Sequence, residues 1–190
     1  MSGLSSETYN DLVSLGRRLY DEALVRSEQE DITDPRGQPI GWLLDTRMPM
    51  LSGHIMPEVG RVLGERLAAR GINQVVGLGF GSYAIVSSVV AADNHPPFMG
   101  GFIRDNRKPH GRKRLVEGPV DRGQPVVLLD DILNSARSAL KAVELLKQDG
   151  FQVVGMMCLF HFTWSGGKGR LENGGIWVDS LLDLNLRDGE

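Results

Sequence analysis

Apolar residues along the chain alternate between short continuous runs and stretches at helical spacing. The runs at 74–78, 98–104, 126–129 and 152–160 predict short buried strands. Between these runs, the small and branched residues over 83–92 predict one helix, and apolar residues at helical spacing predict another after 138. This alternation predicts an α/β domain with a mainly parallel central sheet flanked by helices.

The N-terminal part of the chain is more irregular. Apolar residues at helical spacing over 8–26 predict an amphipathic helix, and a turn-rich stretch over 32–47 leads into a short strand around Trp42–Leu44. A second helix is predicted over 50–70, broken early by Pro57 and stopped by Gly71.

After residue 164, the sequence predicts a loop over 165–170 and an edge strand over 176–182. We expect one domain over 1–190, in which 1–47 and 163–190 form a small hood.

The composition narrows the functional classes. The chain has 190 residues, 41% of them hydrophobic and 24% charged, which is ordinary for a globular domain. Its net charge of −3 gives no global attraction for nucleic acid, and no apolar run is long enough to cross a bilayer. The N-terminus lacks the apolar region of a signal peptide, and the single cysteine, Cys158, excludes an internal disulfide; both fit a cytoplasmic protein.

Two neighbouring carboxylates follow the apolar run Val126–Leu129. Asp130 and Asp131 end this predicted strand, and the small polar turn Asn134–Ser138 leads into the next helix. Ligands of open α/β sheets bind beyond the carboxyl ends of the strands, and the start of a helix favours a phosphate. The pattern therefore predicts a ribose-phosphate site. A plain strand and helix joined by a solvated acidic turn would have the same sequence pattern.

Two further segments fit a polyanionic ligand. Gly77, Gly79, Gly81 and Ser82 follow a strand, where glycines let the backbone approach a phosphate or simply allow close packing. The stretch 104–118 begins with six Lys or Arg residues within eleven positions and has no apolar periodicity. It could close over a diphosphate as a mobile loop, or be a solvated surface loop; an RNA-binding patch is less favoured because no aromatic residues are interleaved.

Together these segments resemble the type I phosphoribosyltransferases, and most of all the orotate phosphoribosyltransferases. The Asp130–Asp131 strand and its polar turn resemble the family's motif for phosphoribosyl pyrophosphate (PRPP). The stretch from Phe102 to Gly118, with Arg104, Lys108 and His110, looks like the family's mobile catalytic loop. Asp45-Thr46-Arg47 is similar to the segment that closes the family's hairpin, and the resemblance runs from about Ile32 to the last strand.

The resemblance implies a role for each matching residue. It implies a homodimer with exchanged catalytic loops, whose partners are PRPP and a nucleobase, with no membrane and no nucleic acid. Asp130 and Asp131 would hold ribose hydroxyls and a Mg²⁺ ion, and His161 and Phe162 would lie at the base. The implied catalytic residues are Arg104, Lys108, His110 and Asp131. The implied PRPP-binding residues are Asp130, Asp131, Asn134, Ser135, Ala136, Arg137, Ser138, Gly79, Gly81 and Ser82.

The sequence also departs from the family pattern. Ala136 and Arg137 stand where the phosphate loop usually has glycines, and Asp105 stands in place of a lysine. Gln38-Pro39 replaces a hairpin lysine, and His161-Phe162 replaces the Asp-Arg whose arginine helps to bind orotate. These losses predict an uncharged base stacked on Phe162 or Trp164, unless another arginine supplies the charge; the candidates are Arg36, Arg137 and Arg170.

Two functions follow. The first is an active phosphoribosyltransferase with an altered base site, which the retained loop residues Arg104, Lys108 and His110 favour. The second is a protein of the same fold that binds PRPP or a nucleotide as a sensor without turnover, which the altered phosphate loop favours.

Overall fold

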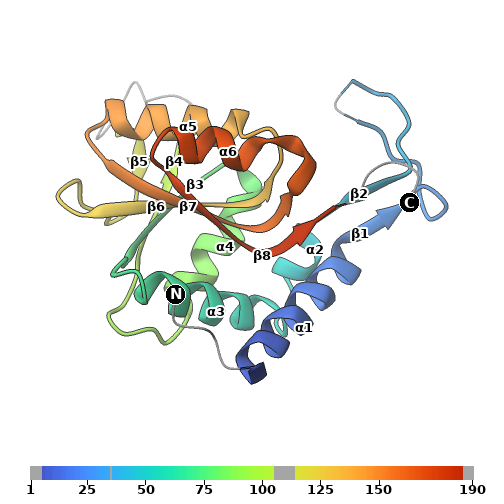
Figure 1. Cartoon of the computed structure of the whole chain (residues 1–190), viewed down its shortest axis with the longest axis horizontal. Coiled ribbons are helices and arrows are strands. Elements are labelled where there is room, and N and C mark those ends of the chain that lie inside the picture. The colour runs from blue at the N-terminus through green and yellow to red at the C-terminus, as the bar shows by residue number, and fades with distance from the viewer. Residues whose placement is uncertain (1–5, 35, 105–113, 186–190) are drawn as a thin grey trace.

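A computed structural model describes residues 6–34, 36–104 and 114–185 and shows an α/β fold built on one six-stranded sheet (Figure 1). The strand order is β5-β4-β3-β6-β7-β8, and every pairing is parallel except that of β4 with β5. The strands are β3 Gln74–Leu78, β4 Met99–Ile103, β5 Val116–Glu117, β6 Pro125–Leu133, β7 Gln152–Phe162 and β8 Trp177–Leu184. The predicted fold class is confirmed.

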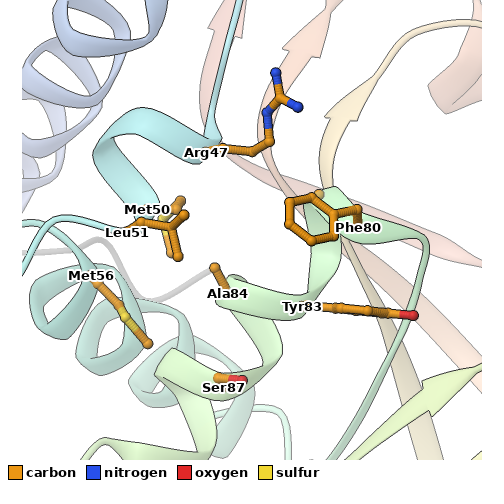
Figure 2. A pocket seen from close by; sticks show the side chains of 9 residues that line it. Arg47, Met50, Leu51, Met56, Phe80, Tyr83, Ala84 and Ser87 are labelled. Carbon is orange, nitrogen blue, oxygen red and sulfur yellow. The ribbon is translucent and has the colours of Figure 1, made fainter.

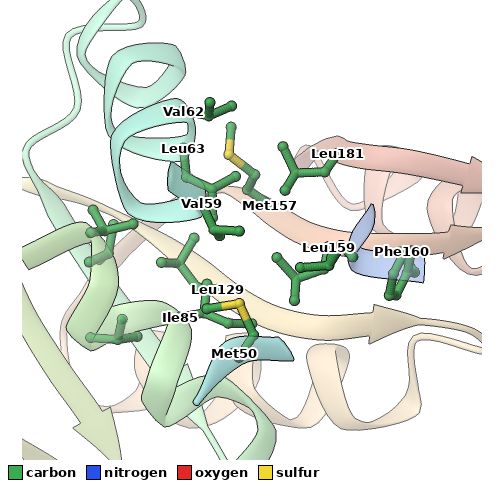
Figure 3. Close-up of a cluster of buried hydrophobic side chains, with 14 of the residues drawn as sticks. Met50, Val59, Val62, Leu63, Ile85, Leu129, Met157, Leu159, Phe160 and Leu181 are labelled. Carbon is green, nitrogen blue, oxygen red and sulfur yellow. The ribbon is translucent and has the colours of Figure 1, made fainter. Parts of the chain in front are cut away.

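Helices cover both faces of this sheet (Figure 1). One face carries α1 Ser6–Ala23, α2 Arg47–Met50, α3 Met56–Ala68 and α4 Phe80–Ala91. The other carries α5 Arg137–Gln148 and α6 Gly167–Asn173. Each layer has its own apolar core, and Figure 3 shows the larger, where Val59 and Leu63 of α3 pack with Leu129 of β6. Among the described residues, no helix is long and apolar enough to cross a membrane.

A short hairpin stands apart from the central sheet. β1 Leu24–Arg26 pairs with β2 Trp42–Leu44 in antiparallel fashion, and a bridge between Thr33 and Pro39 extends the pairing toward the turn. The predicted helix over 8–26 was therefore wrong in its last turn. Residues 24–26 form backbone hydrogen bonds with β2, which a pattern within 8–26 cannot indicate.

Four other predictions needed correction. The helix predicted over 50–70 begins later, as α3 at Met56, and Met50 ends the separate short helix α2. Pro57 lies in the first turn of α3, where its missing N–H is not needed. The loop predicted over 165–170 is largely α6, which buries Leu171. The prediction failed because the glycines of this segment are typical of loops.

The strand predicted to end at Asp130 and Asp131 continues to Leu133, because its pairing with β7 extends past both carboxylates. Strand β5 was not predicted at all, because two residues carry no periodic signal.

Candidate functional site

The carboxyl ends of β3, β6 and β7 bring the predicted site segments to one edge of the sheet. Gly77 of β3 pairs in register with Leu129 of β6, and Asp130 pairs with Cys158 of β7. The glycine loop, the carboxylate pair and the end of β7 therefore lie at the same edge, as parallel pairing requires.

Asp131 is the centre of this edge. Its Oδ2 accepts a hydrogen bond from Thr46 Oγ1 at 2.8 Å, and its Oδ1 accepts one from the Ile132 N–H at 2.8 Å. A side chain at Gly81 would collide with the Asp131 carboxylate, so the glycine loop packs directly against it. Thr46 lies between Asp45 and Arg47, which form a salt bridge with each other at 2.6 Å. The end of the hairpin, the glycine loop and the β6 carboxylate thus meet at Asp131.

Asp130 carries a perturbed carboxyl group. Burial, together with the charge of the neighbouring Asp131, raises its pKa from 3.8 to about 8. The Asp131 N–H donates to Asp130 Oδ1 at 3.0 Å, which offsets part of that effect. Two carboxyl groups held this close favour a bound cation or a bound hydroxyl donor.

The carboxylate pair fits a Mg²⁺ ion shared with a substrate. Mg²⁺ prefers oxygen ligands and is often bound by one or two carboxylates together with phosphates and water. Within the described residues, no group of three or more His, Cys, Asp or Glu could hold a metal. Asp130 and Asp131 would therefore supply two ligands, and the substrate and water the rest.

The turn after β6 leads into α5. Helix α5 begins at Arg137, and Ala136 before it is 3% exposed and has the left-handed backbone conformation, with φ +60° and ψ +13°. This conformation costs a residue with a Cβ about 1 kcal/mol and is normally left to glycine. Ala136 thus keeps the backbone shape of a glycine-containing loop. Arg137 and Ser138 are exposed in the first turn of α5, where backbone N–H groups lack intrahelical partners.

The glycine loop lies at the start of α4. Gly79 has φ +81°, a conformation open to glycine, and Ser82 Oγ donates to the Gly79 carbonyl at 2.8 Å. Ser82 is fully buried, so its hydroxyl closes the loop from within. Gly79 is exposed, and its backbone is accessible to a ligand.

An aromatic cluster lies at the end of β7. The ring of Phe162 stacks on Trp164 at 4.7 Å between centroids and meets the edge of Trp42 at 6.1 Å. Phe162 and Trp164 were singled out from sequence; the contribution of Trp42 was not, because it comes from the hairpin. Trp164 is partly exposed, which leaves part of this aromatic surface accessible.

His161 is engaged differently from Phe162. Both side chains are buried, but Phe162 packs in the apolar core, whereas His161 Nδ1 lies 2.9 Å from Asp183 Oδ1 of β8. Although partial burial opposes the change, hydrogen bonds from Ser180 and His161 lower the pKa of Asp183. The structure therefore ties His161 to the edge strand, and Asp183 gave no signal in the sequence.

Arg104 is the one residue of the predicted catalytic set on the basic loop that the structure describes. Its Nη1 lies 3.4 Å from Glu117 Oε1, and its buried Nε has no hydrogen-bond partner among the described residues. Lys108 and His110, and also Asp105, lie outside the described residues.

A hollow beside Gly81 was not predicted from the sequence. It has a volume of about 290 Å³. Figure 2 shows Arg47, Met50 and Leu51 on one side and Phe80 and Tyr83 on the other. Leu51 and Phe80 are 70% and 68% exposed, so apolar side chains surround its mouth.

Comparisons with known proteins agree with this architecture. No family model matches the chain. An orotate phosphoribosyltransferase from Synechocystis sp. is 31% identical over 151 residues, which cover 78% of this chain and 75% of that protein. One from Listeria monocytogenes is 29% identical over 169 residues, covering 80% and 78%.

Solved structures give the same result. The orotate phosphoribosyltransferase of Mycobacterium tuberculosis in complex with Fe(III) dicitrate has a TM-score of 0.80 at 26% identity, covering 92% of this chain and 97% of that one. The adenine phosphoribosyltransferase of Leishmania donovani has a TM-score of 0.64 at 16% identity, covering 90% and 84%, which supports the fold alone.

The raised pKa of Asp130 predicts a pH-dependent stability. The folded carboxyl keeps its proton up to about pH 8, whereas the unfolded one loses it near its ordinary value of 3.8. Stability should therefore fall as the pH rises through this window, and Asp130→Asn should remove the loss. We compare the free energy of unfolding of Asp130→Asn with that of wild type at each pH. The difference should be larger at pH 8 than at pH 5, in favour of the variant, by on the order of 2 kcal/mol or a few degrees in Tm.

Thermal unfolding at the two pH values, without divalent cations, measures this gain. Asp93→Asn is the matched control, because the Asp93 side chain is 98% exposed and should change Tm little at either pH. An equal Tm difference for Asp130→Asn at pH 5 and pH 8 would contradict the prediction.

Proposed function

The chain belongs to the orotate phosphoribosyltransferase family of type I phosphoribosyltransferases, and from this membership we propose that it transfers the phosphoribosyl group of PRPP to an uncharged nucleobase. The observation that carries the proposal is the convergence on Asp131 of the glycine loop and the hairpin end, at the edge where the α5 turn begins. A carboxylate pair beside two phosphate-binding turns suits a ribose that carries phosphates at both ends.

In this proposal the β6 end holds the sugar. Asp130 and Asp131 bind the ribose hydroxyls and Mg²⁺, and Asp131 also contributes to catalysis. The N–H groups of Asn134–Ser138 and the hydroxyls of Ser135 and Ser138 bind the 5′-phosphate. Gly79 and Gly81 bring backbone close to the pyrophosphate, while the buried Ser82 supports their loop.

The reaction is a displacement at the anomeric carbon. The bond from C1 to the pyrophosphate oxygen breaks, a bond from C1 to a base nitrogen forms, and the base loses a proton. A bound Mg²⁺ would help to neutralise the charge of the leaving pyrophosphate. Arg104, Lys108 and His110 add positive charge there.

The base is proposed to stack at the Phe162 cluster. Trp164 is 37% exposed and offers the accessible ring of this cluster, whereas Phe162, against which both Trp164 and Trp42 pack, is buried behind it. A carboxylate placed here would meet aromatic rings in place of the family's arginine. Arg170, one candidate to supply the charge, donates to the carbonyls of Ser135 and Ser165 instead.

The alternative function is a PRPP or nucleotide sensor without turnover. The observation that favours it is the phosphate loop, where Ala136 and Arg137 replace glycines. Ala136 nevertheless adopts the left-handed conformation that glycine favours, which supports a loop of the family's kind. For this reason we place the enzyme first.

A steady-state assay with PRPP, Mg²⁺ and a panel of bases tests the proposal. We expect turnover of uracil, hypoxanthine or adenine, with kcat/KM for orotate at least about a hundredfold lower, because two charge-assisted contacts are missing. PRPP binding by calorimetry without turnover of any base would support the sensor. Efficient turnover of orotate alone would contradict the altered base site.

Phe162→Arg should move the specificity toward orotate, and because Phe162 is buried, Tm is measured alongside to establish that the variant folds. Restoring one charge-assisted contact is expected to raise kcat/KM for orotate about tenfold or more relative to the preferred neutral base. Phe162→Leu is the control, because it removes the same ring contacts without adding a charge. If both variants change the orotate ratio equally, the cation is not the missing element.

We also propose a homodimer in which each subunit lends its loop to the other. The exposed apolar residues around the hollow favour a covering surface; they are Met48, Leu51, Phe80 and Tyr83. Tyr83 contacts Phe102 of β4 at 4.5 Å between ring centroids, and the basic loop leaves β4 at Arg104. A second copy seated on this surface would therefore lie near the start of the loop.

Mixing two inactive variants tests the exchange. Lys108→Ala and Asp131→Asn chains, refolded together, should recover up to about a quarter of wild-type activity, because half of the dimers are mixed and each mixed dimer has one intact site. Each variant refolded alone is the control. Mixed dimers that form without recovering activity would contradict the loop exchange.

A further inference from the structure

Two side chains near the start of α6 donate hydrogen bonds to backbone carbonyls of the phosphate loop, Asn134–Ser138. They are Ser165, just before α6, and Arg170 within it. Arg170 donates from Nε to the Ser135 carbonyl at 3.1 Å and from Nη2 to the Ser165 carbonyl at 2.8 Å. The Ser165 hydroxyl lies within donating distance of the Asn134 carbonyl, at 2.7 Å, and of the Phe162 carbonyl, at 2.8 Å. A side chain at Gly167 would overlap the Asn134 carbonyl, so the two segments are in direct contact.

These bonds determine where the loop's N–H groups point. In a planar trans peptide, the carbonyl of one residue and the N–H of the next point in opposite directions. The carbonyls of Asn134 and Ser135 are directed at Ser165 and Arg170. The N–H groups of Ser135 and Ala136 are therefore directed away from them, to the opposite side of the loop.

The backbone at Ala136 needs such support. A non-glycine residue in the left-handed conformation persists where its surroundings over-determine it. The cap of α5 at Ala136 has no side-chain hydrogen bond, and the residue is buried beside the contacts described above. The bonds to the Asn134 and Ser135 carbonyls restrain the two peptide units that precede it.

We propose that Ser165 and Arg170 are positioning residues of the phosphate loop, which hold its carbonyls back so that its N–H groups bind a phosphate monoester. The inference rests on the proposed function, since it concerns the same loop. It adds two residues from outside the carboxylate motif, and it gives α6 a function in binding the 5′-phosphate of the substrate.

Calorimetry with ribose 5-phosphate, in the absence of Mg²⁺, is the test. Arg170→Ala and Ser165→Ala should each weaken binding about tenfold, and should raise KM for PRPP similarly while KM for the base changes less than twofold. Ser165→Thr keeps the hydroxyl and should restore most of the affinity. Lys168→Ala is the control, because Lys168 lies on the same helix and interacts with Glu172, at 4.0 Å, and with the charge of Asp183, both outside the phosphate loop.

The outcomes separate this inference from the proposed function. Wild-type affinity for ribose 5-phosphate in both variants, with a lower Tm, would show a purely structural role and overturn the inference. If the Arg170→Ala and Ser165→Ala variants turn over a base with an unchanged KM for PRPP, the inference is overturned and the proposed function stands. Arg170-dependent binding of ribose 5-phosphate by a protein that turns over no base would support the inference and contradict the enzyme.

Discussion

The burial of β6 between two parallel neighbours is the constraint on which the rest of the structure depends. Its residues Val126–Leu129 are buried, and hydrogen bonds to β3 and β7 align three strand ends at one edge. A parallel register puts all carboxyl ends at the same edge of the sheet. The carboxylates that follow Leu129 therefore lie next to the glycine loop. The site is thus a consequence of how the core packs.

The same constraint gives the site its electrostatic character. Asp130 and Asp131 stay in a partly buried environment, where the pKa of Asp130 is raised. Such a pair is unfavourable alone and favourable with a cation, a hydroxyl donor or a proton. The free backbone N–H groups at the start of α5 have the opposite preference, for an anion. One strand end and one helix start therefore suit a ligand that carries both hydroxyls and phosphates.

The family's architecture is kept here, and we propose that the base end differs. The resemblance to the family places Phe162 at the position of an arginine, and the hairpin and the β7 end build an aromatic cluster around it with Trp42 and Trp164. Aromatic rings stabilise a base by stacking, which depends little on its charge, whereas a carboxylate needs a matched cation. Specificity can therefore change at one strand end without disturbing the sugar site.

The sequence by itself determined the parallel strands of the sheet, the α/β class, the carboxylate pair and the glycine loop, because these depend on local apolar runs and on parallel pairing. It did not reveal β1, Thr46 on Asp131, Trp42 on Phe162, or Arg170 on the Ser135 carbonyl. Each of these joins residues at least 35 positions apart, or, for β1, strands 16 residues or more apart, and no local pattern encodes such a contact. Only the packing of the hairpin and α6 against the sheet edge decided them.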